Sequence, residues 1–262
     1  MNTFEKQMVN VLRQLRNDFH AVSVKAEFEA EGSRVEEVLR LKDISMSAGL
    51  KLALKIGGCE AITDLYQCRT IGVQKVVAPM VESAFALKKY LGAIRAAYPE
   101  DEIGDVLWAV NIETDLGCRS FEEMLALPEI SQLNGIVVGR GDLAGSLGMT
   151  RKDVNHPRLC ELTRELLAHA KRHQPALETV VGGGVSASSI PFFREVAPTL
   201  DYYETRKVIF DCPAALADQP EGGLSKALEF ELLWLKNKCQ HYGKISQEDQ
   251  KRVDDLSARL NP

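Results

Sequence analysis

The sequence predicts an α/β fold, and within that class a TIM-type (β/α) barrel. Short β-type runs alternate with helical runs, which is the pattern of parallel strands joined by crossover helices. The 262 residues, 45% of them hydrophobic, suffice to bury the core of one such domain. Polar or glycine residues stand at the carboxyl end of nearly every β-type run, where barrel active sites form. We therefore expect one catalytic domain.

Seven strands are expected after a first helix at about residues 3 to 18. They lie at 22–29, 51–58, 74–82, 106–114, 135–142, 179–185 and 201–210. The segments between them carry apolar residues at helical spacing, so they can cover the outside of a sheet. A closed barrel needs an eighth strand, which the pattern does not show. Either the first strand is missing or atypical, or the N-terminal helix takes its place.

A helical extension is expected after the barrel, with residues 1–222 forming the barrel domain and 223–262 the extension. An apolar helix begins at about residue 223, and Ser246 with Asp249 resembles a capping box that opens a last, charged helix. The apolar helix packs either on its own barrel or on a neighbouring subunit. We expect a homo-oligomer.

Composition narrows the classes of partner. The net charge is -5 and the basic residues are scattered among acidic ones, so we expect no nucleic-acid partner. No segment approaches the roughly 20 apolar residues that cross a bilayer, and the charged N-terminus does not resemble a signal peptide. The six cysteines are dispersed without a CxxC pair, as is typical of free thiols in a reducing compartment. We expect a cytoplasmic protein that does not bind membranes.

Two carboxylates are the first candidates for chemistry. Glu113 ends one predicted strand and Asp142 ends the next, so both should emerge side by side at the barrel mouth. Two carboxylates with room for water and substrate oxygens suit a hard cation such as Mg²⁺ or Mn²⁺. In the alternative interpretation, Glu113 belongs to an ion pair at the mouth and Asp142 caps the following turn.

The glycines around Asp142 favour a ligand site. Gly139, Gly141 and Gly145 stand where small residues let the backbone come close to a ligand. Backbone N–H groups there could hold a carboxylate. A tight turn without a ligand would use glycine too.

The order of the motifs resembles the HpcH/HpaI aldolases and citrate lyase β-subunits, within the phosphoenolpyruvate/pyruvate-binding barrels. The resemblance covers about residues 22 to 210. The motifs that carry it are Glu27-Phe28-Glu29, Lys55-Ile56-Gly57-Gly58, Pro79-Met80-Val81-Glu82-Ser83, Ile112-Glu113-Thr114 and Gly139-Arg140-Gly141-Asp142-Leu143-Ala144-Gly145-Ser146-Leu147-Gly148. Five motifs in the family's order make a chance match improbable.

The resemblance implies a role for each motif. The family's metal ligands fall on Glu113 and Asp142, and a pyruvate-like 2-oxo acid would chelate the metal, which stabilises the enolate formed as a C–C bond breaks or forms. Lys55 stands where the family usually has an arginine that contacts the keto oxygen, and a lysine lacks its bidentate fork. The remaining positions expected to bind substrate are Glu82, Gly139, Arg140 and Gly141.

One departure concerns proton transfer. The aldolases of this family carry a D-x-E-H pattern, whereas this chain has Ala30 at the histidine position. None of its five histidines is an obvious replacement. Glu27 and Glu29 are therefore the candidate general bases, acting directly or through a metal-bound water, and neighbouring carboxylates should raise the pKa of at least one of them unless the metal offsets it.

The segment 202–207 is charged where a buried strand should be apolar. We predict that Arg206 faces the mouth and binds a substrate carboxylate or phosphate. The alternative is a Glu204–Arg206 pair that seals the barrel. This feature is not part of the aldolase pattern and indicates a specialised branch.

Three functions compete. The first is a metal-dependent lyase of the aldolase type, which acts on pyruvate, oxaloacetate or a related 2-oxo acid without a histidine base. The second is acyl-CoA chemistry like that of citrate or malyl-CoA lyases, including thioester hydrolysis, although no basic, adenine-sized site favours CoA. The third is a non-catalytic oxo-acid-binding or regulatory protein. The charged mouth favours an enzyme over a scaffold.

Overall fold

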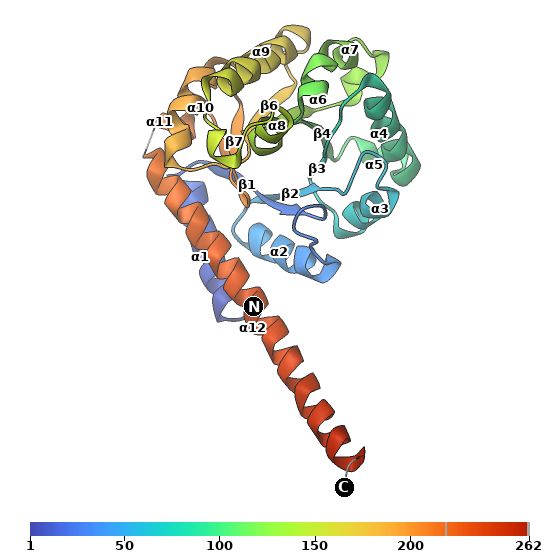
Figure 1. Cartoon of the computed structure of the whole chain (residues 1–262), viewed down its shortest axis with the longest axis vertical. Coiled ribbons are helices and arrows are strands. Elements are labelled where there is room, and N and C mark those ends of the chain that lie inside the picture. Colours follow the sequence, from blue (N-terminus) through green and yellow to red (C-terminus); the bar gives the residue numbers. More distant parts are fainter. Residues whose placement is uncertain (218, 261–262) are drawn as a thin grey trace.

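A computed structural model of the chain describes residues 1–217 and 219–260. Its centre is a closed barrel in which the strands neighbour one another in the order of the sequence (Figure 1). The strands are β1 (Ala21–Glu27), β2 (Lys51–Lys55), β3 (Lys75–Ala78), β4 (Leu107–Ile112), β5 (Gly135–Gly139), β6 (Glu178–Gly182), β7 (Tyr202–Glu204) and β8 (Val208–Asp211). The barrel predicted from the sequence is thus confirmed.

Helices surround this barrel. They are α1 (Thr3–Asp18), α2 (Val35–Ser47), α3 (Ile62–Ile71), α4 (Ala84–Ala97), α5 (Glu100–Ile103), α6 (Asp115–Arg119), α7 (Phe121–Leu125), α8 (Arg140–Ser146), α9 (Pro157–His173), α10 (Ile190–Val196), α11 (Ala214–Ala217) and α12 (Pro220–Leu260). Short 3₁₀ turns lie at Pro128–Gln132, Arg151–Asp153, Ala187–Ser189 and Ala197–Thr199. The first helix has the bounds that the sequence predicts.

The barrel has two apolar layers. Inside it, small side chains of four neighbouring strands fill the space: Val77, Ala109, Val137 and Val180. Between the strands and the outer helices lies a much larger core, to which α4 adds Leu87, Leu91 and Ile94. Burial on both faces explains why the strands read as nearly continuous apolar runs. Charged residues inside this apolar barrel are therefore exceptional, and their presence has to be explained.

The eighth strand lies inside the segment predicted as one strand at 201–210. That segment is a hairpin, in which β7 and β8 pair antiparallel and Tyr203 lies opposite Phe210. A connection of residues 205–207 is too short for the crossover that parallel strands need, so the chain reverses. β8 then pairs antiparallel with β1 and closes the barrel. The prediction of a missing first strand, or of the N-terminal helix in its place, was wrong.

Aromatic packing holds this hairpin against the barrel wall. The ring of Tyr203 stacks on Phe210 and on Phe193 of α10, with centroid distances of 4.9 Å on both sides. All three rings are buried. The stack shields the hairpin from solvent, as a crossover helix shields the strands elsewhere in the barrel.

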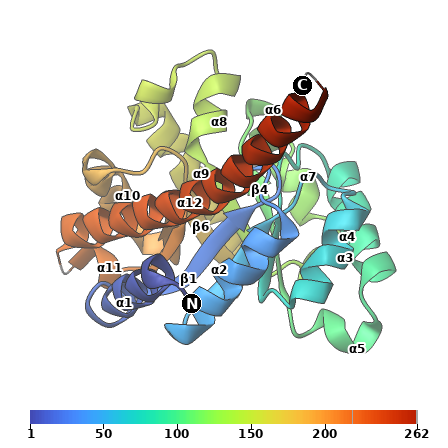
Figure 2. The same ribbon diagram turned by 90° about the horizontal axis from the view of Figure 1, so that it is seen from below.

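α12 is one continuous helix of 41 residues. Its first part packs along α1 on its own barrel, and the remainder projects past the barrel (Figures 1 and 2). The predicted boundary at 222/223 therefore falls within its first turn. Ser246 and Asp249 open no new helix, because both lie in the uninterrupted interior of α12.

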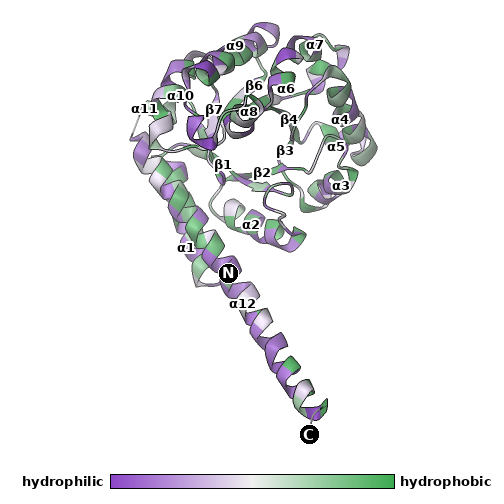
Figure 3. Cartoon of the chain, in the orientation of Figure 1, coloured by the Kyte–Doolittle hydropathy of each residue, from purple (hydrophilic) through white to green (hydrophobic). Residues whose placement is uncertain are grey.

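The projecting part of α12 makes no hydrogen bond or ion pair with the barrel in the described chain. Residues 244–260 are all exposed, and polar residues dominate there with a few isolated apolar ones (Figure 3). The last link to the barrel is the hydroxyl of Tyr242, which donates to Glu37 at 2.6 Å. The barrel domain thus depends on α12 only as far as about residue 242.

A chain that ends after Lys244 should therefore keep the stability of the barrel. We expect its free energy of unfolding to differ by about 0.5 kcal/mol or less, the usual range for exposed positions. Urea denaturation of both chains measures the difference. A loss of several kcal/mol would mean that the projecting segment is packed in solution, for which a second copy is the first candidate.

Candidate active site

A cavity of about 680 Å³ opens at the carboxyl ends of the strands. The beginning of α12 contributes one wall, through Leu224, Leu228 and Glu231 among others. Eight residues that the sequence assigns to the site line it: Glu27, Glu29, Lys55, Glu113, Gly139, Gly141, Asp142 and Arg206. The structure thus gathers most of the predicted site into one space.

Glu113 lies just after β4 and is buried, with 2% of its surface exposed. Its Oε1 accepts a hydrogen bond from the backbone N–H of Met80 at 3.0 Å, and its Oε2 accepts one from Nδ2 of Asn111 at 2.8 Å. Burial raises the pKa of Glu113 against the opposing charge of Lys55, and the charge of Asp142 adds to the rise. The carboxylate is held rigidly, yet its charge is poorly compensated by the protein.

The neighbouring strand is shaped around this carboxylate. A Cβ on Gly139 would lie 2.4 Å from Oε2 of Glu113, which is closer than real contacts allow. Only glycine therefore fits at the end of β5. Three residues further on, Asp142 is exposed in the first turn of α8 and lines the same cavity. The two carboxylates reach the cavity from adjacent strands, as the sequence predicts.

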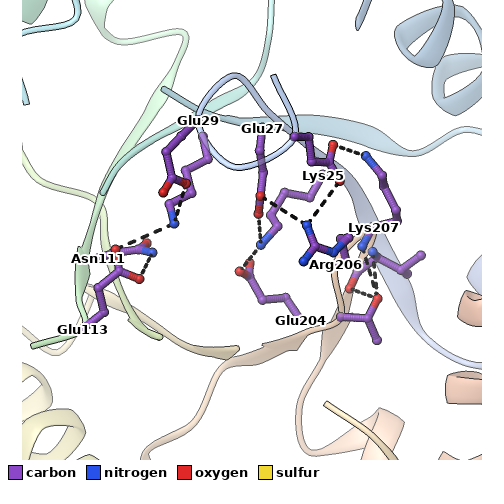
Figure 4. Close-up of polar contacts among 12 residues, drawn as sticks. Lys25, Glu27, Glu29, Asn111, Glu113, Glu204, Arg206 and Lys207 are labelled. Carbon is purple, nitrogen blue, oxygen red and sulfur yellow. Dashed lines mark hydrogen bonds and ion pairs between the residues drawn. The ribbon is translucent and has the colours of Figure 1, made fainter. Parts of the chain in front are cut away.

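Lys55 ends β2 and bridges two acids of the site (Figure 4 shows Glu29 and Glu113 on one side of the mouth). Its Nζ lies 3.1 Å from Glu29 and 3.7 Å from Glu113. Burial by itself would lower the pKa of Lys55, but Glu113 and Glu29 outweigh it and raise the pKa above its ordinary value. Lys55 is therefore a fixed positive charge.

A second cation, Lys25, was missed by the sequence analysis. It lies inside the barrel on β1, with Nζ 2.6 Å from Glu204 and 3.1 Å from Glu27 (Figure 4). Burial alone would lower the pKa of Lys25, but the two carboxylates raise it instead. The signal was present, because Lys25, Glu27 and Glu29 stand two residues apart and such residues share one face of a strand.

Lys25 reverses the expectation for Glu27. Burial tends to raise the pKa of this carboxyl, but the charge and hydrogen bond of Lys25 outweigh burial, so that the pKa lies below its ordinary value. The rise predicted for at least one of the two acids therefore does not occur at Glu27. Its nearest charged neighbour is a cation.

Arg206 lies in the turn between β7 and β8, half exposed at the mouth. Three carboxylates surround its guanidinium at 3.8 to 3.9 Å: Glu27, Glu31 and Glu231. The Glu204–Arg206 pair considered above does not form, because Glu204 binds Lys25 instead. The adjacent Lys207 is buried, pairs with Glu31 and lies near the ring of Trp234.

Two predicted substrate contacts do not reach the cavity. Arg140 is fully buried, and its guanidinium donates to backbone carbonyls of Val154, Gly182 and Gly183. As the first residue of α8 it turns away from the mouth, packs on the rings of Phe192 and Phe193, and ties α8 to β6. Glu82 follows β3 but is not among the residues that line the cavity. Both predictions are corrected.

Asn111 is a further site residue that the sequence analysis missed. It precedes Glu113 by two positions on β4, is 5% exposed and lines the cavity. Its Nδ2 donates to Glu113, while its buried Oδ1 has no hydrogen-bond partner in the described structure. A buried amide oxygen without a partner is costly. The amide nitrogen of Asn111 thus holds Glu113 in place from the same strand.

The histidine position of the aldolase pattern does lie at the cavity, where Ala30 stands. None of the five histidines, all within the described residues, is part of the lining. His156, for example, caps α9 by accepting from the backbone N–H of Arg158. The lining of the cavity thus includes no imidazole.

The charges of the cavity divide into two groups. Lys25 and Arg206 balance Glu27 and Glu204. On the other side the lining holds Lys55, which pairs with Glu29 and Glu113, together with Asp142, and these four residues have a formal charge of -2. Arg151, Glu221 and Glu231 also line the cavity, so the whole lining has a formal charge of -3. Most of the excess negative charge therefore lies between β1, β2, β4 and β5.

Comparison with known proteins fits this geometry. The HpcH/HpaI aldolase/citrate lyase family matches residues 19–190. The chain therefore belongs to this family of barrel enzymes. No curated protein matches the chain.

Solved structures share the fold at low sequence identity. An HpcH/HpaI aldolase/citrate lyase family protein from Burkholderia cenocepacia J2315 has a TM-score of 0.60 and 14% identity over 91% of this chain and 99% of that chain. Citrate synthase SbnG has a TM-score of 0.58 and 15% identity, with coverages of 89% and 90%. Macrophomate synthase has a TM-score of 0.57 and 15% identity, with coverages of 91% and 82%.

Two further expectations can be compared with the structure. All six cysteines are free. Within residues 1–217 and 219–260, the helices include none that is long and apolar enough to cross a membrane.

Removing Lys25 should show how much the barrel depends on it. Lys25→Met leaves Glu27 and Glu204 buried without their cation, and breaking a buried pair in this way costs about 3–5 kcal/mol. Adding Glu204→Gln should restore part of the loss, since one stranded charge is then removed. Urea denaturation of the two variants measures both effects. Equal stability of the single and double variants would contradict the interpretation.

The lowered pKa of Glu27 predicts a pH-dependent contribution to stability. A carboxyl whose pKa is lowered in the folded state stabilises the fold at pH values above its ordinary pKa of 4.5. This stabilisation is lost as the pH falls through the lowered pKa of the folded state. Glu27→Gln should therefore lower the free energy of unfolding at pH 7, and the gap to the wild type should narrow below about pH 4.5. A gap that is constant with pH would show that the loss is not electrostatic.

Proposed function

We propose that the protein is a divalent-metal-dependent carbon–carbon lyase of the aldolase type that acts on a small 2-oxo acid such as pyruvate or oxaloacetate. The observation that carries the proposal is the pair Glu113 and Asp142 at neighbouring strand ends, beside the fixed charge of Lys55. Membership of the HpcH/HpaI aldolase/citrate lyase family supports it.

The residues fit Mg²⁺ or Mn²⁺. Glu113 and Asp142 offer the hard oxygen ligands that these cations prefer, and the formal charge of -2 around Lys55 equals what one such cation neutralises. The described residues contain no group of three or more His, Cys, Asp or Glu side chains arranged to hold a metal. Two carboxylates with water and substrate oxygens at the other positions are the usual arrangement for Mg²⁺.

The reaction needs stabilisation of negative charge on the keto oxygen. When bound, the cation supplies Lewis acidity toward that oxygen. Lys55 is placed to stabilise the same charge, because its pKa is raised and it stays protonated throughout. Gly139 keeps Glu113 in place, since no larger residue leaves room for the carboxylate. Gly141 lines the same wall and is placed to contact the acid.

Proton transfer falls to Glu29. Of the two acids that follow from the sequence, Glu27 is fixed in its charged form by Lys25. Glu29 lies beyond the end of β1, has 29% of its side chain exposed and is paired with Lys55. It combines contact with the cavity and freedom to move, as a base acting beside Lys55 requires.

The alternatives are weaker. Two structural neighbours are a citrate synthase and macrophomate synthase, which supports carbon–carbon bond chemistry more than thioester hydrolysis. Seven carboxylates and four cations line the cavity, a formal net charge of -3. That excess disfavours the phosphates of CoA. A purely regulatory protein would still bind the oxo acid and metal, and only measured turnover separates it from an enzyme.

Self-association is part of the proposal. Ile245, Val253, Leu256 and Leu260 are exposed on the projecting part of α12, and their spacing places them on one side of the helix. An apolar stripe without cover in a charged helix favours a partner helix, and we assign a second copy of this chain. Light scattering on the chain truncated after Lys244 tests whether association is lost while the barrel stays folded.

The metal assignment predicts a loss of two linked properties. Glu113→Gln with Asp142→Asn should abolish Mn²⁺ binding measured by calorimetry. It should also slow the Mn²⁺-dependent exchange of pyruvate methyl protons with D₂O by about 100-fold or more, which ¹H NMR follows without a second substrate.

The matched control removes two carboxylates from exposed positions away from the cavity, Glu165→Gln with Asp249→Asn. It should bind Mn²⁺ and exchange protons as the wild type does. Unchanged Mn²⁺ affinity in the folded site variant would refute the metal site. Binding of both ligands by the wild type without any exchange would favour the regulatory protein.

A further inference from the structure

We propose that the opposite opening of the barrel, at the amino ends of the strands, holds a second binding site, and that its ligand is a small carboxylate with an apolar or aromatic body. The inference goes beyond the proposed function, because it concerns a separate cavity of about 390 Å³. No described residue lines both this cavity and the one at the carboxyl ends of the strands.

The alternation of side chains along the strands places the second cavity at the far end of the barrel interior. Residues two apart on a strand share one face. On β4, Leu107 lines the second cavity, Ala109 lies in the apolar layer inside the barrel, and Asn111 lines the first cavity. Lys75 begins β3 and Glu178 begins β6, and both line the second cavity. The barrel thus has a cavity at each end, with an apolar layer between them.

Positive charge is the first observation that points to a ligand. Three cations, Arg16, Lys51 and Lys75, line the second cavity against a single carboxylate, Glu178, which gives a formal charge of +2. The whole chain has a net charge of -5, so this excess is local. A cleft lined by charges of one sign concentrates ions of the opposite sign. The ligand is therefore an anion.

Lys75 supplies the second observation. It is only 8% exposed, and its Nζ lies 2.7 Å from Oε2 of Glu178. An ammonium group has three donors, and no other hydrogen bond joins Lys75 to the described protein. Buried donors without acceptors are unfavourable. Lys75 can bind a carboxylate oxygen of a ligand while it keeps its pair with Glu178.

The two other cations lie at the rim of the cavity. A Cβ on Gly49 would lie 1.9 Å from Nη1 of Arg16, so glycine is what allows the guanidinium to lie there. Nη1 donates to the carbonyl of Ala48 at 3.0 Å, while Nη2 has no hydrogen-bond partner in the described structure. Lys51 is exposed and forms no ion pair with the described residues. Both cations thus have donors to spare for an anion.

The remaining wall is apolar and selects the body of the ligand. It is formed by the ring of Tyr202 with Val22, Leu50, Leu107 and Ile209. Burial and the charge of Glu178 raise the pKa of Tyr202 to about 12, so its hydroxyl stays a donor. Inorganic phosphate would use the cations and leave this wall without a partner. A single-ring carboxylate uses both, and the cavity lies within the range of about 300–1,000 Å³ typical of ligand sites.

A purely structural plug of the barrel would not need this arrangement. The pair of Lys75 and Glu178 is neutral by itself and suffices to fill the barrel end. Arg16 and Lys51 add charge of one sign, which repels the ammonium of Lys75 unless an anion is bound. The excess charge is unfavourable for folding alone and favourable for binding.

The test uses 4-fluorobenzoate, which joins a carboxylate to one ring and has no 2-oxo group that could chelate a metal. A titration of the full-length protein, followed by ¹⁹F NMR, should show saturable binding. The neutral analogue 4-fluorobenzyl alcohol should bind about tenfold more weakly, as expected for the loss of a charge-assisted hydrogen bond. Inorganic phosphate should displace the probe only at concentrations well above that of 4-fluorobenzoate.

Three variants locate the probe. Lys75→Met with Glu178→Gln removes the buried pair without stranding a charge, keeps the formal charge of the lining, and should weaken binding about tenfold. Lys51→Met changes an exposed position and should weaken it about threefold. Val22→Trp fills the cavity with every charge in place and should abolish saturable binding.

Two controls complete the experiment. Lys88→Met removes an exposed cation from α4, outside both cavities, and should bind the probe as the wild type does. Glu113→Gln with Asp142→Asn should also leave binding unchanged, which places the probe away from the mouth.

The inference would be overturned by absent saturation, by equal affinity for the neutral analogue, or by tighter binding of inorganic phosphate. Unchanged affinity in both Val22→Trp and the variant without the buried pair would overturn it too. Loss of binding in the Glu113 and Asp142 variant would place the probe at the mouth instead. The proposed function does not depend on any of these outcomes, since pyruvate proton exchange tests it separately.

Discussion

The ion pair between Lys25 and Glu204 is the interaction on which the rest of the mouth depends. It joins the first strand to β7 across a barrel whose last strand runs the opposite way, at 2.6 Å and almost out of contact with solvent. Charges buried this deeply are stable only as partners. Each carboxylate that Lys25 holds is therefore fixed in position and in charge. Glu27 becomes a poor base for the same reason.

The two halves of the cavity differ in how far the protein compensates their charges. Around Lys25 the protein compensates its own charges, which favours a rigid wall. Around Lys55 it does not, and the raised pKa of Glu113 expresses that deficit. A site with uncompensated negative charge is unfavourable for folding by itself and favourable for a cation. The same barrel thus compensates the charges in one half of its mouth and leaves those of the other half uncompensated.

The sequence predicts the strands and helices of the barrel well because each buried strand is a continuous apolar run. It also predicts the meeting of Glu113, Asp142 and Lys55, since residues at the carboxyl ends of successive strands share one edge.

The sequence does not reveal the hairpin, because Thr205, Arg206 and Lys207 include no glycine or proline that marks a turn. Nor does it reveal the direction of a side chain. Arg140 stands inside the loop motif, yet helical geometry turns it into the protein, where backbone carbonyls satisfy it. The capping signal at Ser246 predicts the start of a new helix, but α12 continues through this residue because nothing there interrupts it.

The departures from the usual barrel and the C-terminal wall of the cavity lie in the same place. The family match ends at residue 190, before β7, the hairpin turn and α12. Glu113, Asp142 and Lys55 lie within the matched range, whereas Glu204, Arg206 and the wall from α12 lie beyond it. Without a crossover helix between β7 and β8, the turn at Arg206 and the start of α12 both border the cavity. The residues that match the family's motifs at the cavity thus lie at the ends of β2, β4 and β5, while the C-terminal elements supply the remaining wall. Lys25 joins the two parts, because it extends from a strand of the matched barrel to a carboxylate that only the hairpin provides.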